Sequence, residues 1–184
     1  QEPDAKWRQI SESKGVTVHQ LNSIDPTLLV HRAEAVFVGV SLLDLWAILS
    51  NFGTRKAWSK TFENAELLEH VNEMSELWHN IIDPENLWRK SRDMYLYPWL
   101  SLSSARDALL LRTTYKSPDS IHIFGLSVDD KTLFPELPDP DEPHSIRQTI
   151  ALQGWSLEKL SPNTVHVTLI EQADPRGWTT KGAM

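Results

Sequence analysis

The chain has 184 residues and no cysteine, carries a formal net charge of −7, and has 40% apolar residues. That length and apolar content suffice for one domain with a core or an enclosed cavity. The acidic balance argues against nucleic acid as a partner, because nucleic-acid surfaces need clustered Lys and Arg. Without cysteine there is no disulfide framework, no thiolate zinc site and no cysteine nucleophile, which fits a cytoplasmic protein.

No apolar run approaches the roughly 20 residues of a membrane-spanning helix. The chain begins at Gln1 with neither an initiator Met nor the apolar stretch of a signal peptide. We therefore expect a piece of a longer protein, in which residues 1–184 form a single domain. Eight tryptophans are a high count for this length. Trp is a large amphipathic side chain that suits cavity walls, interfaces and membrane surfaces.

The first part of the chain predicts a short helix followed by two strands. Pro3–Ser13 has Trp7 and Ile10 three residues apart and is followed by a glycine as a stop signal, which favours a helix. Val16–Leu21 and Leu28–Gly39 are strand-like, and the turn-forming residues between them predict an antiparallel hairpin.

A second helix is predicted to begin at Ser41. Asp44 completes a capping-box-like pair with Ser41. The apolar positions that follow share one helical face, which must lie on the sheet: Leu42, Leu45, Trp46 and Leu49. Asn51–Thr54 is expected to end this helix, and Arg55–Trp58 is expected to be a loop.

The middle of the chain is less regular. Glu63–Val71 has high helix propensity but also the alternation of an edge strand, so both interpretations stay open. Glu76–Ile82 alternates as a strand does. Pro84–Lys90 favours a short helix, and the aromatic segment Tyr95–Trp99 follows it.

An arginine lies inside the most apolar strand, Ser104–Tyr115. Alternation places Arg112 on the same face as Ala108 and Leu110. If that face is the interior, a partner from protein or ligand must offset the charge, because desolvating an unpaired guanidinium costs several kcal/mol. The alternative is a half-exposed strand with Arg112 in solvent and the row that contains Leu109 buried.

The last part of the chain predicts three further strands. Ile121–Val128 forms a hairpin with the arginine-bearing strand. Asp129–His144 contains four prolines and six acidic residues, so we expect a solvated excursion with little to bury. Ile146–Leu160 is a long strand in which Gly154 marks a bulge or a close approach, and Thr164–Gln172 follows it. Two or three helices with about eight strands indicate an α+β fold, in which a long curved antiparallel sheet wraps around helices.

The common catalytic signatures are missing from the sequence. Seven histidines show no metal-ligand spacing, and there is no nucleophile elbow, P-loop or dinucleotide fingerprint. We therefore expect no enzyme, no cofactor and no metal. His79, Asp107 and Arg112 are near enough in the chain to share a site, but structural ion pairing explains them as well. Trp58 and Trp99, both in predicted loops, are candidates for contact with a membrane surface.

Short motifs recur along nearly the whole chain. In order they are Trp7, Val38–Ser41 with Leu45 and Trp46, Arg55–Trp58, Leu77–His79, Ser104–Asp107, Ile146 with Arg147, Gly154 with Trp155, and Asp174–Trp178. Their order and spacing together resemble the START (StAR-related lipid-transfer) domain family, which has the helix-grip fold.

The resemblance implies that one lipid or sterol binds in a deep apolar cavity between the curved sheet and a C-terminal helix. The residues expected to line it are Trp78, Leu110, Arg112, Phe124, Leu152 and Trp155. Sterol-carrying relatives pair an arginine at the position of Arg112 with an acidic residue on the neighbouring strand, and this acidic position corresponds here to Asn80. Because a neutral amide cannot offset the charge, an anionic headgroup such as a phosphate would suit the site.

The family continues after Gly177 and Trp178 in a long helix that covers the cavity. The residues that remain before Met184 make at most about two helical turns. We therefore expect the lid helix to be absent and the cavity to be open on one side, where exposed apolar surface would promote self-association.

The main hypothesis is non-covalent binding of a lipid or sterol, and its transfer between membranes by a cytoplasmic domain that contacts the membrane surface transiently. The alternative is a lipid-free interaction or regulatory module on the same fold, which Asn80 and the missing lid favour. A third hypothesis, an enzyme of the wider helix-grip superfamily, is disfavoured because no nucleophile or metal constellation is readable.

Overall fold

The structure, a computed structural model, describes residues 6–21, 30–59, 62–83, 105–139 and 145–174. This part of the chain forms one sheet of ten strands and two short helices, which confirms the α+β class. The strands are β1 (Trp7–Ser13), β2 (Val16–Leu21), β3 (Val30–Val38), β4 (Phe62–His70), β5 (Ser75–Ile82), β6 (Ala105–Lys116), β7 (Ser120–Ser127), β8 (Ser145–Arg147), β9 (Thr149–Ser161) and β10 (Thr164–Asp174). The helices are α1 (Leu42–Ser50) and α2 (Phe52–Trp58).

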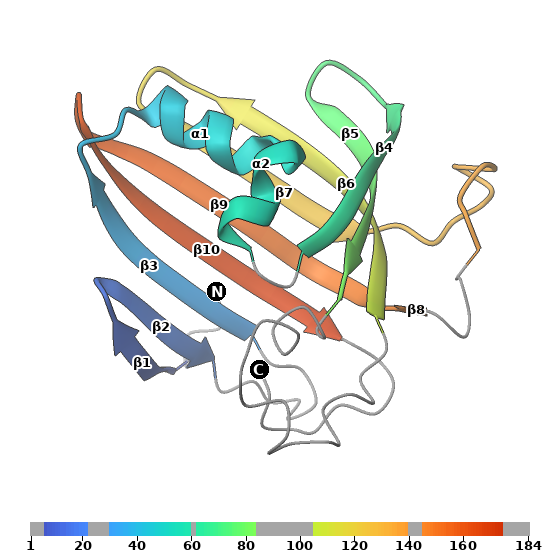
Figure 1. Cartoon of the computed structure of the whole chain (residues 1–184), viewed down its shortest axis with the longest axis horizontal. Helices are drawn as coiled ribbons and strands as arrows, with labels where there is room; N and C mark the ends of the chain where they lie inside the picture. Colours follow the sequence, from blue (N-terminus) through green and yellow to red (C-terminus); the bar gives the residue numbers. More distant parts are fainter. Residues whose placement is uncertain (1–5, 22–29, 60–61, 84–104, 140–144, 175–184) are drawn as a thin grey trace.

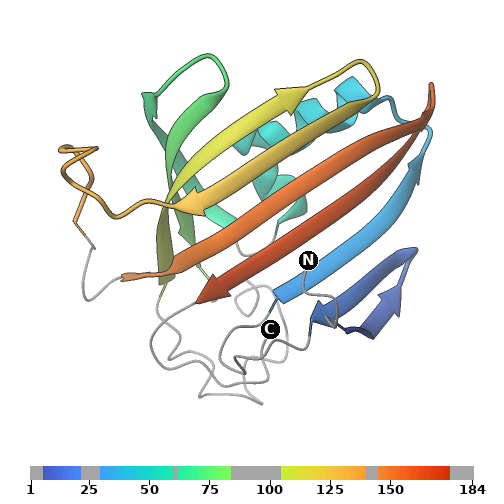
Figure 2. The same cartoon turned by 180° about the vertical axis from the view of Figure 1, so that it is seen from behind.

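The strands are arranged in the order β1-β2-β3-β10-β9-β7-β6-β5-β4. Neighbours along this order are antiparallel, whereas the short β8 pairs with β6 in parallel. Both helices lie on the same face of the curved sheet (Figure 1), and the strands stand in front of them in the view from behind (Figure 2). We call the face that the helices cover the inner face and the opposite face the outer face.

The first helix is fixed by its N-cap and by its apolar side. The Ser41 hydroxyl oxygen accepts a hydrogen bond from the Asp44 backbone N–H at 3.2 Å, which satisfies one of the free donors of the first turn. Leu42 and Leu45 are buried on the inner face of the sheet. Their partners come from β7, β9 and β10: Ile121, Ile123, Leu157, Val165 and Val167. The helix predicted after Ser41, and its position on the sheet, are therefore confirmed.

The helix predicted at Pro3–Ser13 is wrong, because residues from Trp7 onwards form the edge strand β1. β1 pairs with β2 across a tight turn in which Lys14 and Gly15 have φ of 52° and 79°. Two positive φ angles in a row match the twist of a two-residue hairpin. Most of β1 is exposed, so the spacing of its apolar residues reflects no buried helical face.

Residues 55–58 and 63–71, predicted as a loop and as either a helix or a strand, form a helix and a strand. Arg55–Trp58 is not a loop, because it belongs to α2, whose N-cap Asn51 accepts a hydrogen bond from the Gly53 N–H at 2.8 Å. A single glycine therefore did not prevent a second helix from starting directly after the first. Glu63–Val71 resolves as a strand, since most of it belongs to β4, which pairs with β5.

The long strand predicted at Ile146–Leu160 is divided at Gln148 into β8 and β9. The pairing of β9 has no register shift at Gly154. The predicted bulge is therefore absent. A Cβ atom on that glycine would lie 3.6 Å from the ring of Phe124, which is an ordinary contact distance, so no close approach requires a glycine here.

The excursion after β7 is only partly solvated. Leu137 is 5% exposed and packs with Leu77 and Leu109 on the outer face, and Phe134 and Val128 pack against the same cluster. The expectation that this segment has little to bury is therefore wrong. Its many prolines and acidic residues obscured two apolar side chains that anchor it to the sheet.

Candidate ligand-binding interior

A row of mostly polar residues crosses the inner face of the sheet. Residues opposite each other on paired strands point to the same face. Following the pairing from β5 to β2, the row contains Glu76, Arg112, Gly125, Gln153, Glu171, His31 and Gln20. We call these seven residues the polar row. Apolar side chains flank it along the strands, with Ile123 and Trp155 on one side and Leu110 on the other.

Arg112 lies on the inner face and is paired by protein. Its side chain is 11% exposed, and Nη2 donates to Glu76 Oε2 at 2.6 Å. Nη1 donates to the carbonyl oxygen of Ser50, at the end of α1, at 3.2 Å. The guanidinium carbon lies 4.8 Å from the ring centre of Phe52 and 5.1 Å from that of Trp78. The interpretation with Arg112 in solvent is therefore wrong.

The residue expected opposite Arg112 was Asn80, and that assignment is wrong. The register places Asn80 opposite Ala108, whereas Glu76 stands opposite Arg112. The acidic partner is thus present, and an uncompensated charge on Arg112 no longer argues for an anionic headgroup. Asn80 is 4% exposed, and its Oδ1 has no hydrogen-bond partner among the described residues.

The environment of Glu76 favours its charged form. Burial alone would raise the pKa of this carboxyl, but hydrogen bonds from Trp78 and Arg112 outweigh burial and lower the pKa below its usual value. The Trp78 indole N–H donates to Glu76 Oε2 at 2.9 Å, to the same oxygen that Arg112 contacts. Glu76, Arg112 and Trp78 therefore form one charged unit at one end of the polar row.

A second arginine, which sequence reasoning did not select, enters the interior from α2. The guanidinium carbon of Arg55 lies 5.0 to 5.6 Å from the ring centres of three aromatic residues, Phe52, Trp58 and Phe62. Burial lowers the pKa of Arg55, and the charge of Arg112 adds to this, while Glu171 acts in the opposite direction. The Nε atoms of Arg55 and Arg112 are both buried, and neither has a hydrogen-bond partner within the described chain.

Glu171 on β10 is the acidic residue whose charge acts on Arg55. Burial raises the pKa of its carboxyl above the usual value, although Arg55, a hydrogen bond from Gln153 and the proximity of His31 act to lower it. Glu171 and Gln153 were also missed from the sequence. The alternation of β10 alone could have indicated that Glu171 shares a face with Leu169, which is opposite Trp155.

The cavity that the described residues enclose at the interior is small. A cavity of about 20 Å³ lies between the helices and the sheet, which is room for about one water molecule. Its lining comes from both helices and from β6, β7 and β9: Leu49, Phe52, Arg55, Trp58, Leu110, Arg112, Ile123, Gln153 and Trp155.

Two of the residues expected to line this interior lie elsewhere. Phe124 immediately precedes Gly125 of the polar row, so its side chain projects from the outer face. There its ring centre is 6.4 Å from that of Tyr115. Leu152 shares this outer face because it precedes Gln153. The expectation for both residues is therefore wrong, since it rested on apolar character without knowledge of the register. Trp78, Leu110 and Trp155 do lie at the interior, as expected.

The two tryptophans predicted to contact membranes have different outcomes. Trp58 is the last residue of α2 and is 40% exposed. Its ring centre lies 6.5 Å from that of Trp155 in an edge-on arrangement, so part of the ring closes the interior. Trp99 and the predicted helix Pro84–Lys90 lie outside the described residues, and so does the segment after Asp174 where the lid helix was expected to be absent.

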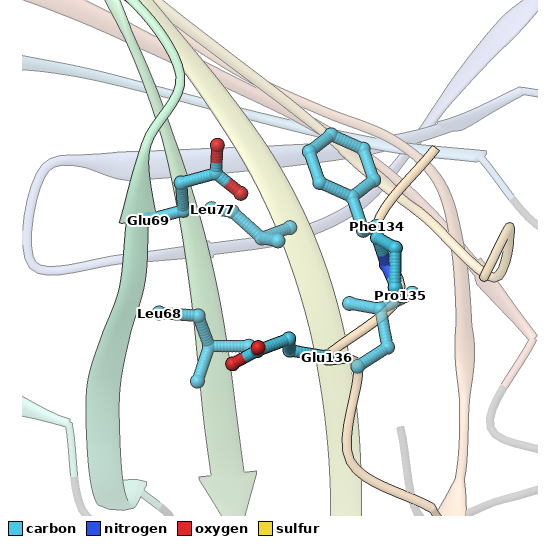
Figure 3. A pocket seen from close by; sticks show the side chains of 7 residues that line it. Leu68, Glu69, Leu77, Phe134, Pro135 and Glu136 are labelled. Atoms are coloured by element: carbon cyan, nitrogen blue, oxygen red, sulfur yellow. The ribbon is translucent and has the colours of Figure 1, made fainter. Parts of the chain in front are cut away.

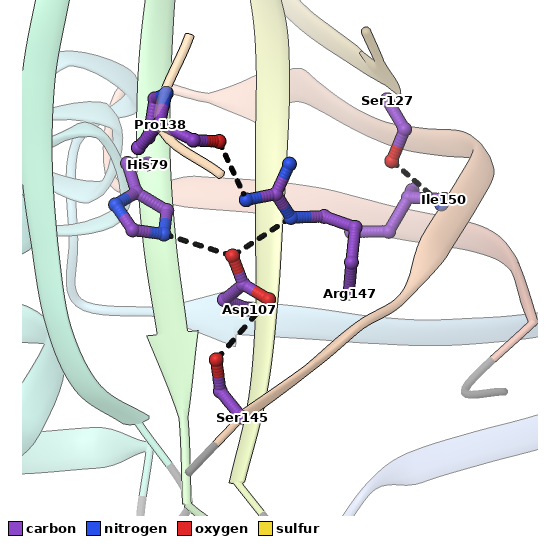
Figure 4. A network of polar contacts seen from close by, with 7 residues as sticks. All are labelled: His79, Asp107, Ser127, Pro138, Ser145, Arg147 and Ile150. Carbon is purple, nitrogen blue, oxygen red and sulfur yellow. Dashed lines mark hydrogen bonds and ion pairs between the residues drawn. The ribbon is translucent and has the colours of Figure 1, made fainter. Parts of the chain in front are cut away.

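A separate polar network lies on the outer face (Figure 4). Asp107 is 2% exposed. Its Oδ2 accepts a hydrogen bond from Arg147 Nε at 2.7 Å and lies 3.0 Å from His79 Nε2. Arg147 also donates to the Pro138 carbonyl at 3.1 Å. Arg112 is on the other face and pairs with Glu76, so the three residues share no site, and structural ion pairing is the alternative that holds. The network connects β5, β6, β8 and the segment after β7.

This outer network has the character of a structural anchor. Burial would raise the pKa of Asp107, but hydrogen bonds and charges from His79 and Arg147 lower it below the usual value. The Ser145 hydroxyl donates weakly to the other oxygen of Asp107 at 3.4 Å, and the Ser127 hydroxyl is occupied by the Ile150 backbone N–H. Among the described residues no group of three or more His, Asp or Glu side chains is placed to hold a metal ion.

One curved antiparallel sheet with two helices on its inner face, and a polar row beneath them, defines a helix-grip domain. A family model for the START domain matches residues 1–184. The chain belongs to the START domain family.

Solved structures of similar fold agree with this assignment. Human STARD10 is 18% identical, with a TM-score of 0.75, over 96% of this chain and 64% of that one. Human StAR-related lipid transfer protein 5 is 20% identical, with a TM-score of 0.74, over 98% of this chain and 77% of that one. A STAR-related lipid transfer protein from Xanthomonas axonopodis is 18% identical, with a TM-score of 0.64, over 93% of this chain and 82% of that one.

The chain spans less than two thirds of the length of the STARD10 structure. A search among curated proteins found no match. Neither helix of the described part of the chain is long and apolar enough to cross a membrane.

Proposed function

We propose that this chain binds a lipid or sterol non-covalently between α2 and the inner face of the sheet, and carries it between membranes. Membership of the START domain family supports the class of ligand. The observation that carries the proposal is the pair of buried guanidinium groups at the small cavity, Arg55 and Arg112, whose Nε–H groups lack acceptors within the described chain. An unsatisfied buried donor costs about 1–3 kcal/mol, so a ligand oxygen that accepts these bonds has a clear energetic advantage.

The arrangement of the interior suits an amphipathic ligand. The polar row offers donors and acceptors at one level of the inner face, and apolar residues such as Ile123, Trp155 and Leu110 lie on either side of it. A polar head at the row with an apolar body beside it would match both surfaces. Glu76 already neutralises Arg112, so the head does not need a negative charge. A hydroxyl or carbonyl is sufficient.

Uptake requires movement, because a cavity of about 20 Å³ cannot hold a lipid. α2 is the element that we expect to move. It has no buried residue, whereas α1 buries Leu42 and Leu45. Displacement of α2 would withdraw Phe52, Arg55 and Trp58 from the cavity lining and open the interior. Trp58, partly exposed beside Lys56, would then contact the membrane surface, as its amphipathic ring allows.

The experiment is native mass spectrometry of the purified chain after incubation with vesicles of mixed phospholipid and sterol, followed by extraction and identification of the released molecule. We expect a one-to-one adduct. Arg55→Met should reduce its occupancy about tenfold, the loss expected for one hydrogen bond to a charged group. Lys159→Met is the control, because Lys159 lies near the far end of β9 and its side chain pairs with Asp119 at 3.2 Å, away from the polar row. Transfer is then measured between donor and acceptor vesicles.

The alternative function is a lipid-free interaction or regulatory module. The small size of the cavity among the described residues favours it, since about 20 Å³ holds no more than about one water molecule. Under this alternative the chain would remain without an adduct after incubation with vesicles, and Arg55→Met would change stability but no transfer rate. We propose a binding role without catalysis in either case. Cytoplasmic location, a single domain over residues 1–184 and self-association remain predictions.

A further inference from the structure

A second pocket lies on the outer face, away from the proposed lipid site (Figure 3). Its volume is about 270 Å³, and one wall comes from β4 and β5 while the other comes from the segment after β7. The lining residues, which we call the outer pocket, are Leu68, Glu69, Leu77, Phe134, Pro135, Glu136 and Leu137. Pockets for whole small molecules are commonly ~300–1,000 Å³, so this volume suits one or two inserted side chains.

A bulge in β4 shapes the first wall. The register of β4 shifts between Leu67 and Glu69, so that Leu68 is an extra residue without a partner on β5. Glu69 stands opposite Leu77, which belongs to the outer face. Because a bulge re-aims the side chains around it, Leu68 and Glu69 both line the outer pocket. The irregular edge also disfavours the addition of a regular strand to β4.

The second wall is held in place at both of its ends. At the beginning, the Val128 N–H donates to the Leu109 carbonyl at 3.0 Å. Near the end, Leu137 is buried against Leu77 and Leu109, and Arg147 donates to the Pro138 carbonyl at 3.1 Å. The outer pocket is therefore formed before any partner arrives, which lowers the entropic cost of binding.

The charge of the outer pocket is negative and uncompensated. Glu69 on β4 and Glu136 on the segment after β7 are both exposed, and neither has an ion-pair partner within the described ranges (Figure 3). The lining contains no Lys or Arg. Lys131, on the same segment as Glu136, is already paired with Asp139 at 2.6 Å. An apolar floor between two free carboxylates fits an apolar side chain that has a cation beside it.

We infer that the outer pocket docks a segment of a partner protein, in which a large apolar side chain stands next to a lysine or arginine. A membrane does not fit, because Glu69 and Glu136 would face lipid phosphates of like charge, and the two walls admit side chains rather than a flat surface. The docking site lies on the face opposite the polar row, so a partner could bind whether or not the interior holds a ligand.

The test is selection of a phage-displayed random dodecapeptide library against the full chain. The sequences enriched should combine Leu, Phe or Met with Lys or Arg. The consensus peptide is then synthesised, labelled and titrated with the chain by fluorescence anisotropy. The double charge reversal Glu69→Lys with Glu136→Lys should weaken binding at least tenfold and favour a peptide in which Glu replaces each Lys and Arg. Both residues are exposed, so the variant should fold.

Two controls separate this site from general electrostatics and from folding. Glu12→Lys with Asp119→Lys makes the same change of net charge away from the pocket and should leave the affinity within twofold. Leu68→Ala should weaken binding severalfold. Leu133→Ala should not, because Leu133 lies on the segment after β7 but outside the lining and is 70% exposed.

Three results would overturn the proposal. One is a library that yields no enriched sequence. Another is an enriched peptide that binds the Glu69→Lys, Glu136→Lys chain as tightly as the original. The third is binding of vesicles of anionic phospholipid that Leu68→Ala weakens, because the outer pocket would then be a membrane contact. None of these depends on lipid uptake, so failure here leaves the proposed function untouched.

Discussion

At the scale of single residues, Arg112 shows how an arginine is accommodated inside an apolar sheet. It has Glu76 opposite, donates to a backbone carbonyl at the end of α1, and lies against the rings of Phe52 and Trp78, which also contact each other. Each contact removes part of the desolvation cost. Alternation predicted which residues share a face with Arg112, but it left open whether that face is the interior. It could not predict the partner either, because Asn80 and Glu76 share that face and only the register decides between them.

Removal of one member of this pair should be costly. Arg112→Met leaves Glu76 without its cation, and we expect a loss of about 2–3 kcal/mol, below the full cost of a broken buried pair because Glu76 is 29% exposed. The double variant Glu76→Gln with Arg112→Met should lose less than the sum of the two single variants. Urea unfolding of the four proteins measures the coupling. Additive losses would show that the pair contributes no interaction energy.

Asp107 should make the free energy of unfolding depend on pH. Its pKa in the folded state is lowered by His79 and Arg147, so it stabilises the fold at pH values above the unfolded pKa of about 4. That stabilisation is lost as the pH falls through the folded pKa. Asp107→Asn should therefore be less stable than the original at pH 7 by about 2–3 kcal/mol, and the difference should shrink below pH 4. Unfolding curves from pH 7 to pH 2 measure this, and a constant difference would contradict the assignment.

At the scale of elements, capping predicted one helix well and missed another. Ser41 and Asp44 marked the start of α1 because the side chain satisfies a donor of the first turn. α2 has a glycine at its second position and is only seven residues long. Its helix propensity is therefore weak, and its tertiary contacts decide whether the helix forms. The helix predicted where β1 lies was wrong for the opposite reason. Pairing with β2 outweighs the helical spacing of its apolar residues.

The cap of α1 can be tested directly. Ser41→Ala removes the acceptor of the Asp44 N–H and should destabilise the protein by about 1 kcal/mol. Ser41→Thr keeps a hydroxyl and should cost only a few tenths. Thermal unfolding measures both. An alanine variant as stable as the threonine variant would mean that the hydrogen bond is replaced by water without loss.

The two helices should differ in their dynamics. α1 buries two leucines and α2 buries none, so we expect amide hydrogen exchange in α2 to be at least tenfold less protected, equivalent to about 1.4 kcal/mol in opening free energy. Mass-spectrometric exchange of the ligand-free chain compares the two helices in one sample. Equal protection would argue against α2 as the element that opens the interior.

At the scale of the whole molecule, the class of fold could be predicted and the arrangement of faces could not. Most of the strands and the helix on the sheet follow from alternation and capping, and the order of short motifs indicated the family. About eight strands were expected and ten are present, because β1 was predicted as a helix and the long strand after residue 145 is divided into β8 and β9. Which residues meet at the interior depends on register, so Arg55, Gln153 and Glu171 were missed, and Phe124 and Leu152 were assigned to the wrong face. A shift of one residue exchanges the two faces of a strand.

The neighbouring position of β3 and β10 has a consequence for the synthesis of the protein. One strand comes near the start of the chain and the other is the last described, yet they share a full antiparallel ladder. On the ribosome, β3 must wait with an unpaired edge until residues 164–174 emerge, and exposed edges invite association with other chains. Long-range pairing is also slow. A nascent chain interrupted after β9 would therefore be a substrate for chaperones rather than a partly working domain.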